Sequence, residues 1–91
     1  MVVRILEDYS LRQMGDDFML VRFGNGSYDM SEVFTFNSTA AFLWNKLREN
    51  SPCESSKLAF WLVEEYGISP EAAEADAAVI LQSWIDSNLV G

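Results

Sequence analysis

The first third of the chain alternates short apolar stretches with turn-forming residues. The apolar stretches are "YSLRQMG", "FMLVRF" and "YDMSEVFTF", all within residues 1–36. Between them lie Gly15-Asp16-Asp17 and Gly24-Asn25-Gly26-Ser27, whose Gly and Asn residues accept the positive φ of a tight turn. We therefore predict three antiparallel strands here. Residues 2–6 are a candidate for a further lead-in strand.

After Phe36 the apolar spacing becomes helical. Four apolar residues follow one another at the i, i+3, i+4, i+7 spacing of a buried helix stripe: Ala40, Leu43, Trp44 and Leu47. Asn37 or Ser38 can accept a hydrogen bond from the free amides of the first turn, so we expect one of them to cap this helix.

Two further helices are predicted by their start signals. In "SPCE", Ser51 would be the N-cap, Pro52 would occupy the first helical position and Glu54 would complete a capping box. The apolar stripe of this second helix is Leu58, Ala59, Leu62, Val63 and Tyr66, and Gly67 is placed to end it. Ser69, Pro70 and Glu71 repeat the start pattern for a third helix that reaches about Asn88. Its apolar stripe is Ala73, Ala77, Ile80, Leu81 and Trp84.

Strands followed by helices, joined by short connections, predict an α+β fold with a three-stranded antiparallel sheet followed by three helices. The length of 91 residues fits a single domain spanning 1–91. The sequence is 49% hydrophobic, which is too apolar for a disordered chain.

Charge narrows the classes of partner. Six basic residues against fourteen acidic ones give a formal net charge of -8. Because nucleic-acid affinity comes from Lys and Arg at the phosphates, this balance disfavours DNA and RNA binding. The chain has no signal-peptide pattern and no apolar run long enough to span a bilayer, and its one cysteine, Cys53, can form no internal disulfide. We therefore expect a cytoplasmic protein without membrane contact.

The side chains do not assemble into a predicted active site. The chain lacks histidine, the residue used most often for proton transfer at neutral pH and for transition-metal binding. Cys53 is expected in the first turn of the second helix, where a helix N-terminus could activate a thiol, but a packed or incidental cysteine is the better explanation. Ser38 and Thr39 lack a neighbouring base, so capping accounts for them. We predict no enzymatic activity, no metal and no cofactor.

Two features point to binding. A three-stranded sheet is too small to close, so its edges can accept a partner strand. Phe60 and Trp61 are adjacent aromatics that lie away from the apolar stripe of the second helix, which makes them candidates for a partner interface. Partial burial of both rings is the alternative.

Most of the chain resembles the PqqD family, named after coenzyme PQQ synthesis protein D and also known as the RiPP recognition element. The matching segments are "YSLRQMGDDFMLV", "TFNSTAAFLWNKL", "LAFWLVEEYGIS" and "AEADAAVILQSWIDSNLVG". Within them, Asn37, Ala41, Leu43 (or Phe42) and Trp44 resemble the signature Asn-x-[ST]-[GA]-x-x-[IL]-W. Tyr66, Asp76 and Leu89-Val90 resemble later landmarks of the family.

The resemblance implies a winged-helix-like, non-catalytic domain that binds the leader of a ribosomally made precursor peptide. The domain would present the peptide to a modifying enzyme, often a radical S-adenosylmethionine (radical SAM) enzyme. The leader would add as a strand beside the third strand and lie against the third helix. Carried onto this sequence, the strand side is Val33, Phe34, Thr35 and Phe36. The helix side is Asp76, Val79, Ile80, Ser83 and Trp84. Of these, Ile80 and Trp84 are expected in the core rather than in contact, and the other three are the better contact candidates.

Three alternatives remain at this point. One is a winged-helix adaptor that binds nucleic acid or a regulatory protein. Another is a small thiol enzyme that uses Cys53. Phe60 and Trp61 stand where the family commonly has polar or small residues, so a homodimer through these rings is a third alternative to a monomer with one peptide site.

Overall fold

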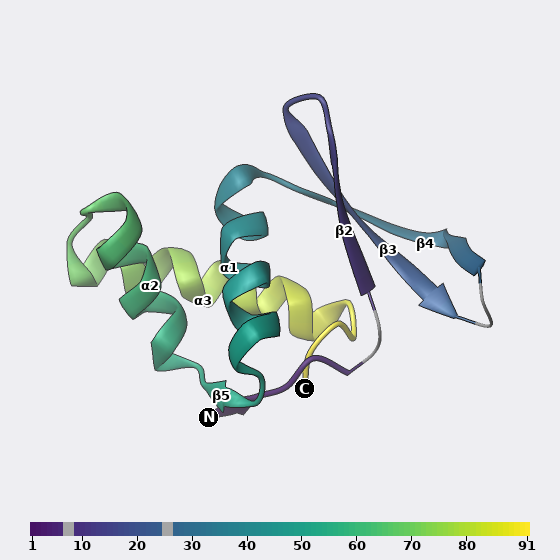
Figure 1. Cartoon of the computed structure of the whole chain (residues 1–91). Helices are drawn as coiled ribbons and strands as arrows, with labels where there is room; N and C mark the ends of the chain where they lie inside the picture. The colour runs from purple at the N-terminus through teal and green to yellow at the C-terminus, as the bar shows by residue number, and fades with distance from the viewer. Residues whose placement is uncertain (7–8, 25–26) are drawn as a thin grey trace. The chain divides into compact units, whose positions relative to one another are not determined.

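The computed structural model describes residues 1–6, 9–24 and 27–91. The elements follow in the order β1 (Val2–Val3), β2 (Tyr9–Met14), β3 (Asp17–Gly24), β4 (Ser27–Phe36), α1 (Ser38–Asn50), β5 (Cys53–Glu54), α2 (Ser56–Tyr66) and α3 (Pro70–Asp86) (Figure 1). The predicted α+β class, with a three-stranded antiparallel sheet and three helices, is confirmed. The winged-helix likeness stays a prediction.

The chain divides into two compact units, which we describe separately. The sheet unit is Glu7–Phe42, and the helical unit is Met1–Leu6 together with Leu43–Gly91. Helix α1 begins in the first and continues in the second. That residues 1–91 form a single domain stays a prediction.

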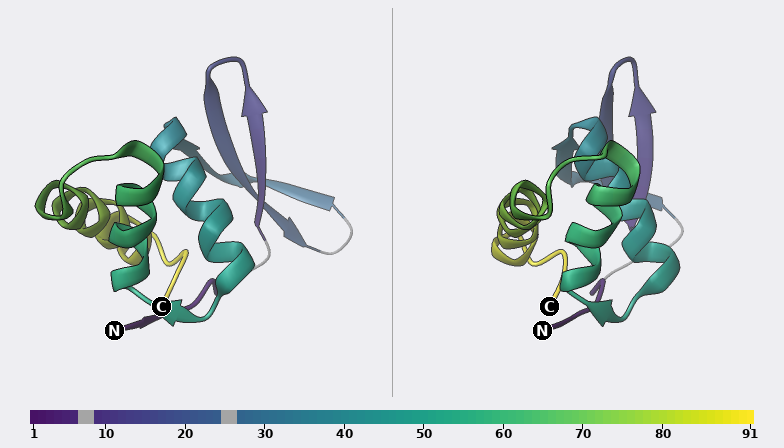
Figure 2. Two further views of the ribbon diagram at one scale, coloured as in Figure 1. Left: turned by 60° about the vertical axis from the view of Figure 1, so that its left-hand side comes forward. Right: turned by 90° about the vertical axis from the view of Figure 1, so that its left-hand side faces the viewer.

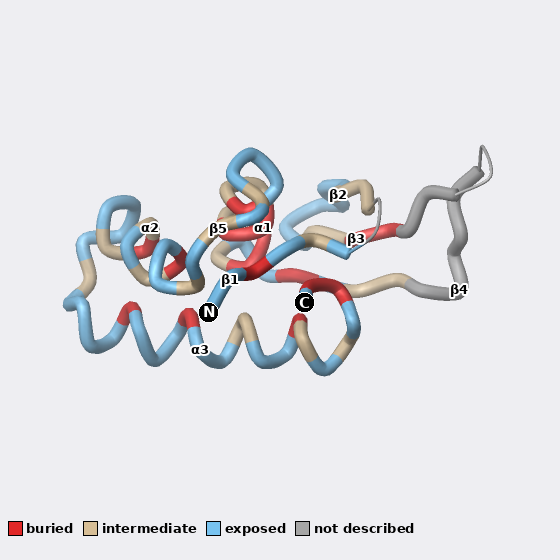
Figure 3. Tube along the Cα trace, turned by 90° about the horizontal axis from the view of Figure 1, so that it is seen from below, coloured by how far each residue is buried: buried red, intermediate tan, exposed pale blue. Residues whose placement is uncertain are grey.

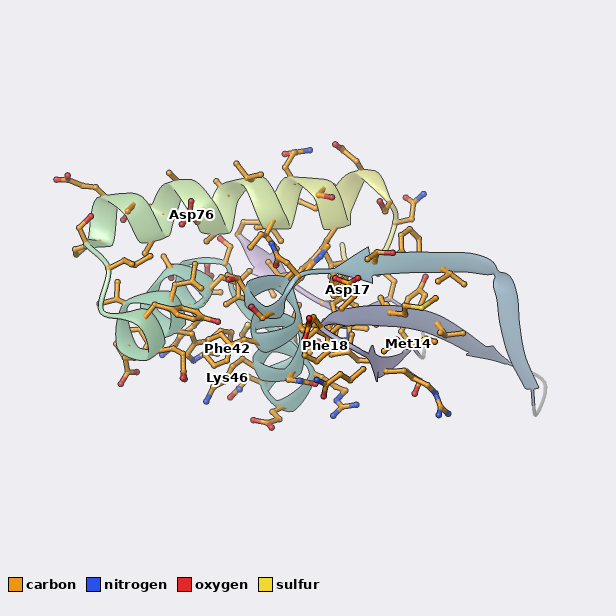
Figure 4. The ribbon with its side chains drawn as sticks, turned by 90° about the horizontal axis from the view of Figure 1, so that it is seen from above. Met14, Asp17, Phe18, Phe42, Lys46 and Asp76 are labelled. Carbon is orange, nitrogen blue, oxygen red and sulfur yellow. The ribbon has the colours of Figure 1, made fainter. Side chains whose placement is uncertain are left out.

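The sheet unit is a meander in the order β2-β3-β4 with antiparallel pairing throughout. The β2–β3 turn lies at Gly15-Asp16, as predicted, and Gly15 has a φ of 66°. Glycine at the first of two loop positions suits the twist that a hairpin requires. Met14 and Phe18, which flank this turn, are labelled in Figure 4. The second predicted turn contains Asn25 and Gly26, which lie outside the described residues.

Asn37 caps helix α1. Its Oδ1 accepts a hydrogen bond from the Ala40 amide at 2.8 Å, and its backbone oxygen accepts one from the Ala41 amide at 3.0 Å. The start of the helix is therefore fixed by the side chain that the sequence suggested. The predicted apolar stripe of α1, formed by Ala40, Leu43, Trp44 and Leu47, is buried along its whole length.

The predicted start of the second helix was wrong. The N-cap is Ser55 rather than Ser51, and α2 begins at Ser56. Residues Cys53–Glu54 form strand β5, which pairs with β1 in the register Val2↔Glu54 and Val3↔Cys53. The local pattern "SPCE" was overridden because a segment more than 45 residues away supplies the backbone hydrogen bonds and buries Val3 completely.

The two ends of the chain meet inside the helical unit (Figures 1 and 2). Arg4 and Gly91 exchange backbone hydrogen bonds of 3.0 and 2.9 Å, and Ile5 forms an antiparallel bridge with Val90. Leu89 and Val90 are buried at this junction. Of the candidate lead-in strand at residues 2–6, only Val2–Val3 form a strand, which pairs with β5, and Ile5 contributes the isolated bridge to Val90.

The remaining helix boundaries follow the predicted signals. Gly67 ends α2 in the left-handed conformation with a φ of 64°, and its amide donates to the Val63 carbonyl. The Ser69 hydroxyl accepts a hydrogen bond from the Ala72 amide, and Pro70 is the first residue of α3. Helix α3 ends at Asp86, two residues before the predicted end. Buried and exposed positions alternate along it with the helical period (Figure 3).

Candidate functional site

Strands β2 and β4 are the two edge strands of the sheet in the part of the chain that the structure describes, and β4 carries the predicted site. Its last residues pair with β3 in a regular register, Phe18↔Phe36, Met19↔Thr35, Leu20↔Phe34 and Val21↔Val33. The next pair is Arg22↔Asp29, so three residues of β4 bulge out of the ladder. The regular segment 33–36 is thus the part of this edge with the geometry to accept another strand.

Side chains of this segment alternate between the two faces of the sheet. Phe34 and Phe36 share a face with Leu20, where Phe34 is half-buried and Phe36 is buried. Tyr9 of β2 meets Phe34 edge to face, with ring centroids 6.4 Å apart. Val33 and Thr35 point to the other face, where Val33 is half-buried and Thr35 is exposed. The two phenylalanines anchor the edge, and Thr35 is the side chain most open to a partner.

Helix α3 places its five candidate residues in two groups. Asp76, Val79 and Ser83 are exposed, and the 72% exposure of Val79 is high for an apolar side chain. Ile80 is half-buried, and Trp84 is 2% exposed. Asp76 is labelled on α3 in Figure 4. Trp84 is therefore a core residue of the helical unit, and the exposed trio is the part of the prediction that can touch a ligand directly.

A shallow open hollow on α3 brings part of this group together. Val79 and Ser83 line it with Ala78, Gln82, Asp86 and Ser87. The Gln82 side-chain amide donates to Asp86 at 2.9 Å, which holds a polar pair at the rim. This surface offers the apolar side chains of Ala78 and Val79 and several hydrogen-bonding groups, the mixture that suits a peptide better than a small apolar molecule.

Phe60 and Trp61 have different environments. The Phe60 side chain is 52% exposed, and the Lys57 ammonium lies 5.5 Å from its ring centroid. Trp61 is half-buried. Phe60 lines a groove between α2 and α3, whereas Trp61 lines none of the hollows described here. The expectation that both rings are presented to a partner therefore has its stronger support at Phe60.

Sequence reasoning did not find the small residues that form this groove. Ser56 and Ala59 on α2 face Glu74 on α3, and the space continues past Ala77 and Ala78. Ser56, Ala59, Phe60 and Val63 share the i, i+3, i+4, i+7 spacing, which was the available signal.

Cys53 lies in strand β5, so its predicted place in the first turn of a helix was wrong. Partial burial raises the pKa of the Cys53 thiol, Lys57 opposes that shift, and the Glu54 carboxylate adds to it. The neutral thiol is thereby favoured over the reactive thiolate.

The described ranges were also searched for other kinds of site. In residues 1–6, 9–24 and 27–91, no three His, Cys, Asp or Glu side chains cluster closely enough to hold a metal ion. Within the same ranges, no helix has the length and apolar character needed to cross a bilayer.

The antiparallel meander β2-β3-β4 and the helices α1, α2 and α3 define an α+β fold. A family model described as coenzyme PQQ synthesis protein D (PqqD) matches residues 20–90. The chain therefore belongs to the PqqD family. A search of curated protein sequences gave no match.

Two solved structures share this fold. One is described as "Lasso peptide synthetase B1 complexed with the leader peptide"; it is 22% identical, has a TM-score of 0.71, and the match covers 98% of this chain and 96% of that chain. The other is "TbiB1 in Complex with the TbiA(beta) Leader Peptide", with 17% identity, a TM-score of 0.69, and coverage of 96% and 93%. At these identities the likeness concerns the fold.

Proposed function

We propose that this chain is a non-catalytic escort that binds the leader of a ribosomally synthesised precursor peptide. The observation that carries the proposal is the edge strand β4, which pairs on one side only among the described residues and ends in a regular segment at 33–36. Membership of the PqqD family supports it. So do the two structures of the same fold, both described as leader-peptide complexes.

The leader adds as a fourth strand along Val33, Phe34, Thr35 and Phe36. Main-chain hydrogen bonds supply affinity without regard to sequence, because every residue of the leader has an N–H and a C=O except proline. Alternate leader side chains then face the surface and supply specificity. Thr35, exposed on the edge, is the first side chain of this protein that such a strand would meet.

The second set of contacts comes from α3. Asp76, Val79 and Ser83 offer a carboxylate, an apolar group and a hydroxyl on exposed positions of one helix. Ile80 contributes its exposed part. Trp84 acts by holding α3 in place, since its ring is buried. The formal charge of -8 and the carboxylate of Asp76 favour a leader that carries Lys or Arg near its binding segment.

The escorted peptide passes to a peptide-modifying enzyme, for which the family resemblance favours the radical SAM type. The raised pKa of the Cys53 thiol agrees with a role in binding. The same charge that attracts a basic leader disfavours nucleic acid. We place the protein in the cytoplasm, where such precursors are made.

Titration of the ¹⁵N-labelled protein with the leader of a precursor peptide encoded beside its gene tests the proposal. We expect saturable shifts of amides in β4 at 33–36 and in α3 at 76–84. Binding with shifts confined to other elements would refute the assigned site. A duplex DNA added in place of the leader is the matched control, and DNA binding that weakens steeply with salt would favour the adaptor alternative.

A further inference from the structure

The groove between α2 and α3 is a second surface with the properties of a docking site. One part is lined by Ser56, Ala59, Phe60, Val63, Pro70 and Glu74 and has a volume of about 280 Å³. The adjoining part, of about 290 Å³, adds Ser55, Ala77, Ala78 and Leu81. Both parts share Ser56, Ala59 and Glu74, so they form one continuous groove along the two helices.

Small side chains make the floor of the groove and a large ring makes its wall. Ala59 is half-buried and Ala77 is buried, whereas the Phe60 side chain is 52% exposed. Lys57 lies over the Phe60 ring, an interaction between a cation and an aromatic face that restrains the ring at the rim. Exposed aromatics beside an apolar recess are the usual anchors of protein interfaces.

The charge around the groove selects the occupant. Helices α2 and α3 carry six acidic side chains and a single basic one, Lys57. Glu74 lies inside the groove itself. A second copy of this chain would bring another Glu74 and another charge of -8 to the same place, and like charges at a two-fold interface repel. A partner with Lys or Arg beside its apolar residues complements the surface.

We propose that this groove docks a basic amphipathic helix of a partner protein. The apolar face of that helix covers Ala59, Phe60 and Val63, which together with Ser56 follow the i, i+3, i+4, i+7 spacing of one face of α2. One Lys or Arg of the partner pairs with Glu74. The occupant is therefore defined by its chemistry, as an apolar stripe flanked by positive charge.

On α3 this groove and the hollow of the proposed leader surface meet at Ala78, which lines both, but most of their residues lie on opposite sides of the helix. At about 100° per residue, the groove residues Glu74, Ala78 and Leu81 lie roughly 165° around the helix from Asp76, Val79 and Ser83. The buried stripe that ends at Trp84 runs between them. One helix can thus serve a leader peptide and a partner protein at the same time, a consequence that rests on the proposed function, whereas the groove itself does not.

The probe is a designed helical peptide with leucine on one face and lysine along both flanks of that face. In titrations of the ¹⁵N-labelled protein, we expect saturable amide shifts at Ala59, Phe60, Val63 and Glu74. A second peptide with the same leucines but glutamate in place of lysine is expected to bind at least about tenfold more weakly. Equal binding of the two peptides, or binding of neither, would overturn the proposal.

Two pairs of variants locate the site. Phe60→Ser and Glu74→Lys are each expected to lower the affinity for the lysine peptide about tenfold or more. The melting temperature should stay nearly unchanged because both side chains are exposed. The matched controls are Val79→Ser, an exposed apolar residue of α3 outside the groove, and Glu65→Lys, an exposed carboxylate of α2 outside the groove. If the control variants lower the affinity for the lysine peptide as much as the groove variants do, the attraction is nonspecific and the proposed site is refuted.

Leader titrations of the same variants separate this proposal from the proposed function. Phe60→Ser is expected to keep leader binding, and Val79→Ser is expected to reduce it. If Phe60→Ser abolishes only the binding of the lysine peptide, the groove is an independent site. This conclusion holds even if no leader peptide binds to the protein. Analytical ultracentrifugation over a range of protein concentrations tests the remaining alternative, a homodimer. If the wild type dimerises and Phe60→Ser dissociates the dimer, the groove binds a second copy of the chain and the proposal of a basic partner helix is refuted.

Discussion

Trp44 of α1 and Trp84 of α3 meet edge to face in the helical unit, with ring centroids 5.2 Å apart and ring planes at 89°. The two side chains are 1% and 2% exposed. An edge-to-face pair places the positive rim of one ring on the negative face of the other, which adds to the free energy gained by burial. The contact joins helices from the two halves of this unit's sequence, so it fixes the orientation of α3 and of every residue that α3 presents.

We therefore expect Trp84→Ala to lower the free energy of unfolding by about 3–5 kcal/mol, the range for removing a large aromatic from a packed core. For a chain of this size the melting temperature should fall by roughly 12 °C or more. Thermal and urea unfolding followed by circular dichroism measure the change. Val79→Ala is the control on the same helix, and a comparable loss there would contradict the assignment of Trp84 to the core.

The side-chain cap of α1 gives a second prediction. Removing the Asn37 oxygen in Asn37→Ala leaves the Ala40 amide without the hydrogen bond seen at 2.8 Å, at a cost of about 1 kcal/mol in the free energy of unfolding. Asn37→Asp keeps an acceptor and should retain most of the stability. Asn50→Ala at the other end of the helix, where the side chain bonds the Lys46 carbonyl in an exposed position, is the matched control. Chemical denaturation of all three variants provides the comparison.

Local patterns in the sequence predicted the elements whose causes are local. The turn at Gly15, the cap at Asn37, the end of α2 at Gly67 and the start of α3 at Ser69 each depend on residues within one turn of the chain. The helical period likewise identified the buried side of α1. These signals needed no knowledge of the rest of the fold.

The errors arose where distant segments compete with a local pattern. "SPCE" has the chemistry of a helix start, yet β1 pairs with Cys53–Glu54 and moves the start to Ser56. No local signal reveals that pairing, because it joins residues near position 2 to residues near position 54. The α2–α3 groove escaped notice for a related reason: small residues on two helices become a recess only when the helices pack.

The thiol of Cys53 gives a third prediction, one that bears on the thiol-enzyme alternative. Since its pKa is raised above the ordinary value of a cysteine, less thiolate is present at pH 8 and alkylation by iodoacetamide should be slower than for free cysteine. Glu54→Gln removes a negative charge that raises the pKa, so the rate should increase. Lys57→Gln removes the charge that lowers it, so the rate should fall.

The pH profile of the alkylation rate gives the direction of each change in the Cys53 pKa. The midpoint of the profile should move to lower pH in Glu54→Gln and to higher pH in Lys57→Gln. Leader binding should be unaffected in Cys53→Ser. A loss of binding or of peptide modification in Cys53→Ser, with the fold intact by circular dichroism, would revive a chemical role for the thiol.

The edge strand yields the most direct prediction about the proposed leader site. In an antiparallel edge strand, the N–H groups of successive residues point alternately toward the neighbouring strand and away from it. Along Val33, Phe34 and Thr35, one alternating set therefore bonds to β3, and the other set faces the open edge. Amides of the first set should exchange slowly with deuterium in the free protein, and amides of the second set should exchange quickly.

Saturation with the leader peptide should slow deuterium exchange of the second set of amides by roughly tenfold or more and leave exchange of the first set little changed. The reason is that strand addition supplies hydrogen-bond partners only to the N–H groups that face the open edge. Hydrogen exchange followed by NMR resolves the individual amides. A leader methylated on alternate backbone nitrogens is the matched control: one methylation register should lose affinity and the other should retain it, since only alternate leader N–H groups face β4. Equal protection of both sets would indicate a general stabilisation, and unchanged exchange at 33–35 with saturating leader would place the peptide elsewhere.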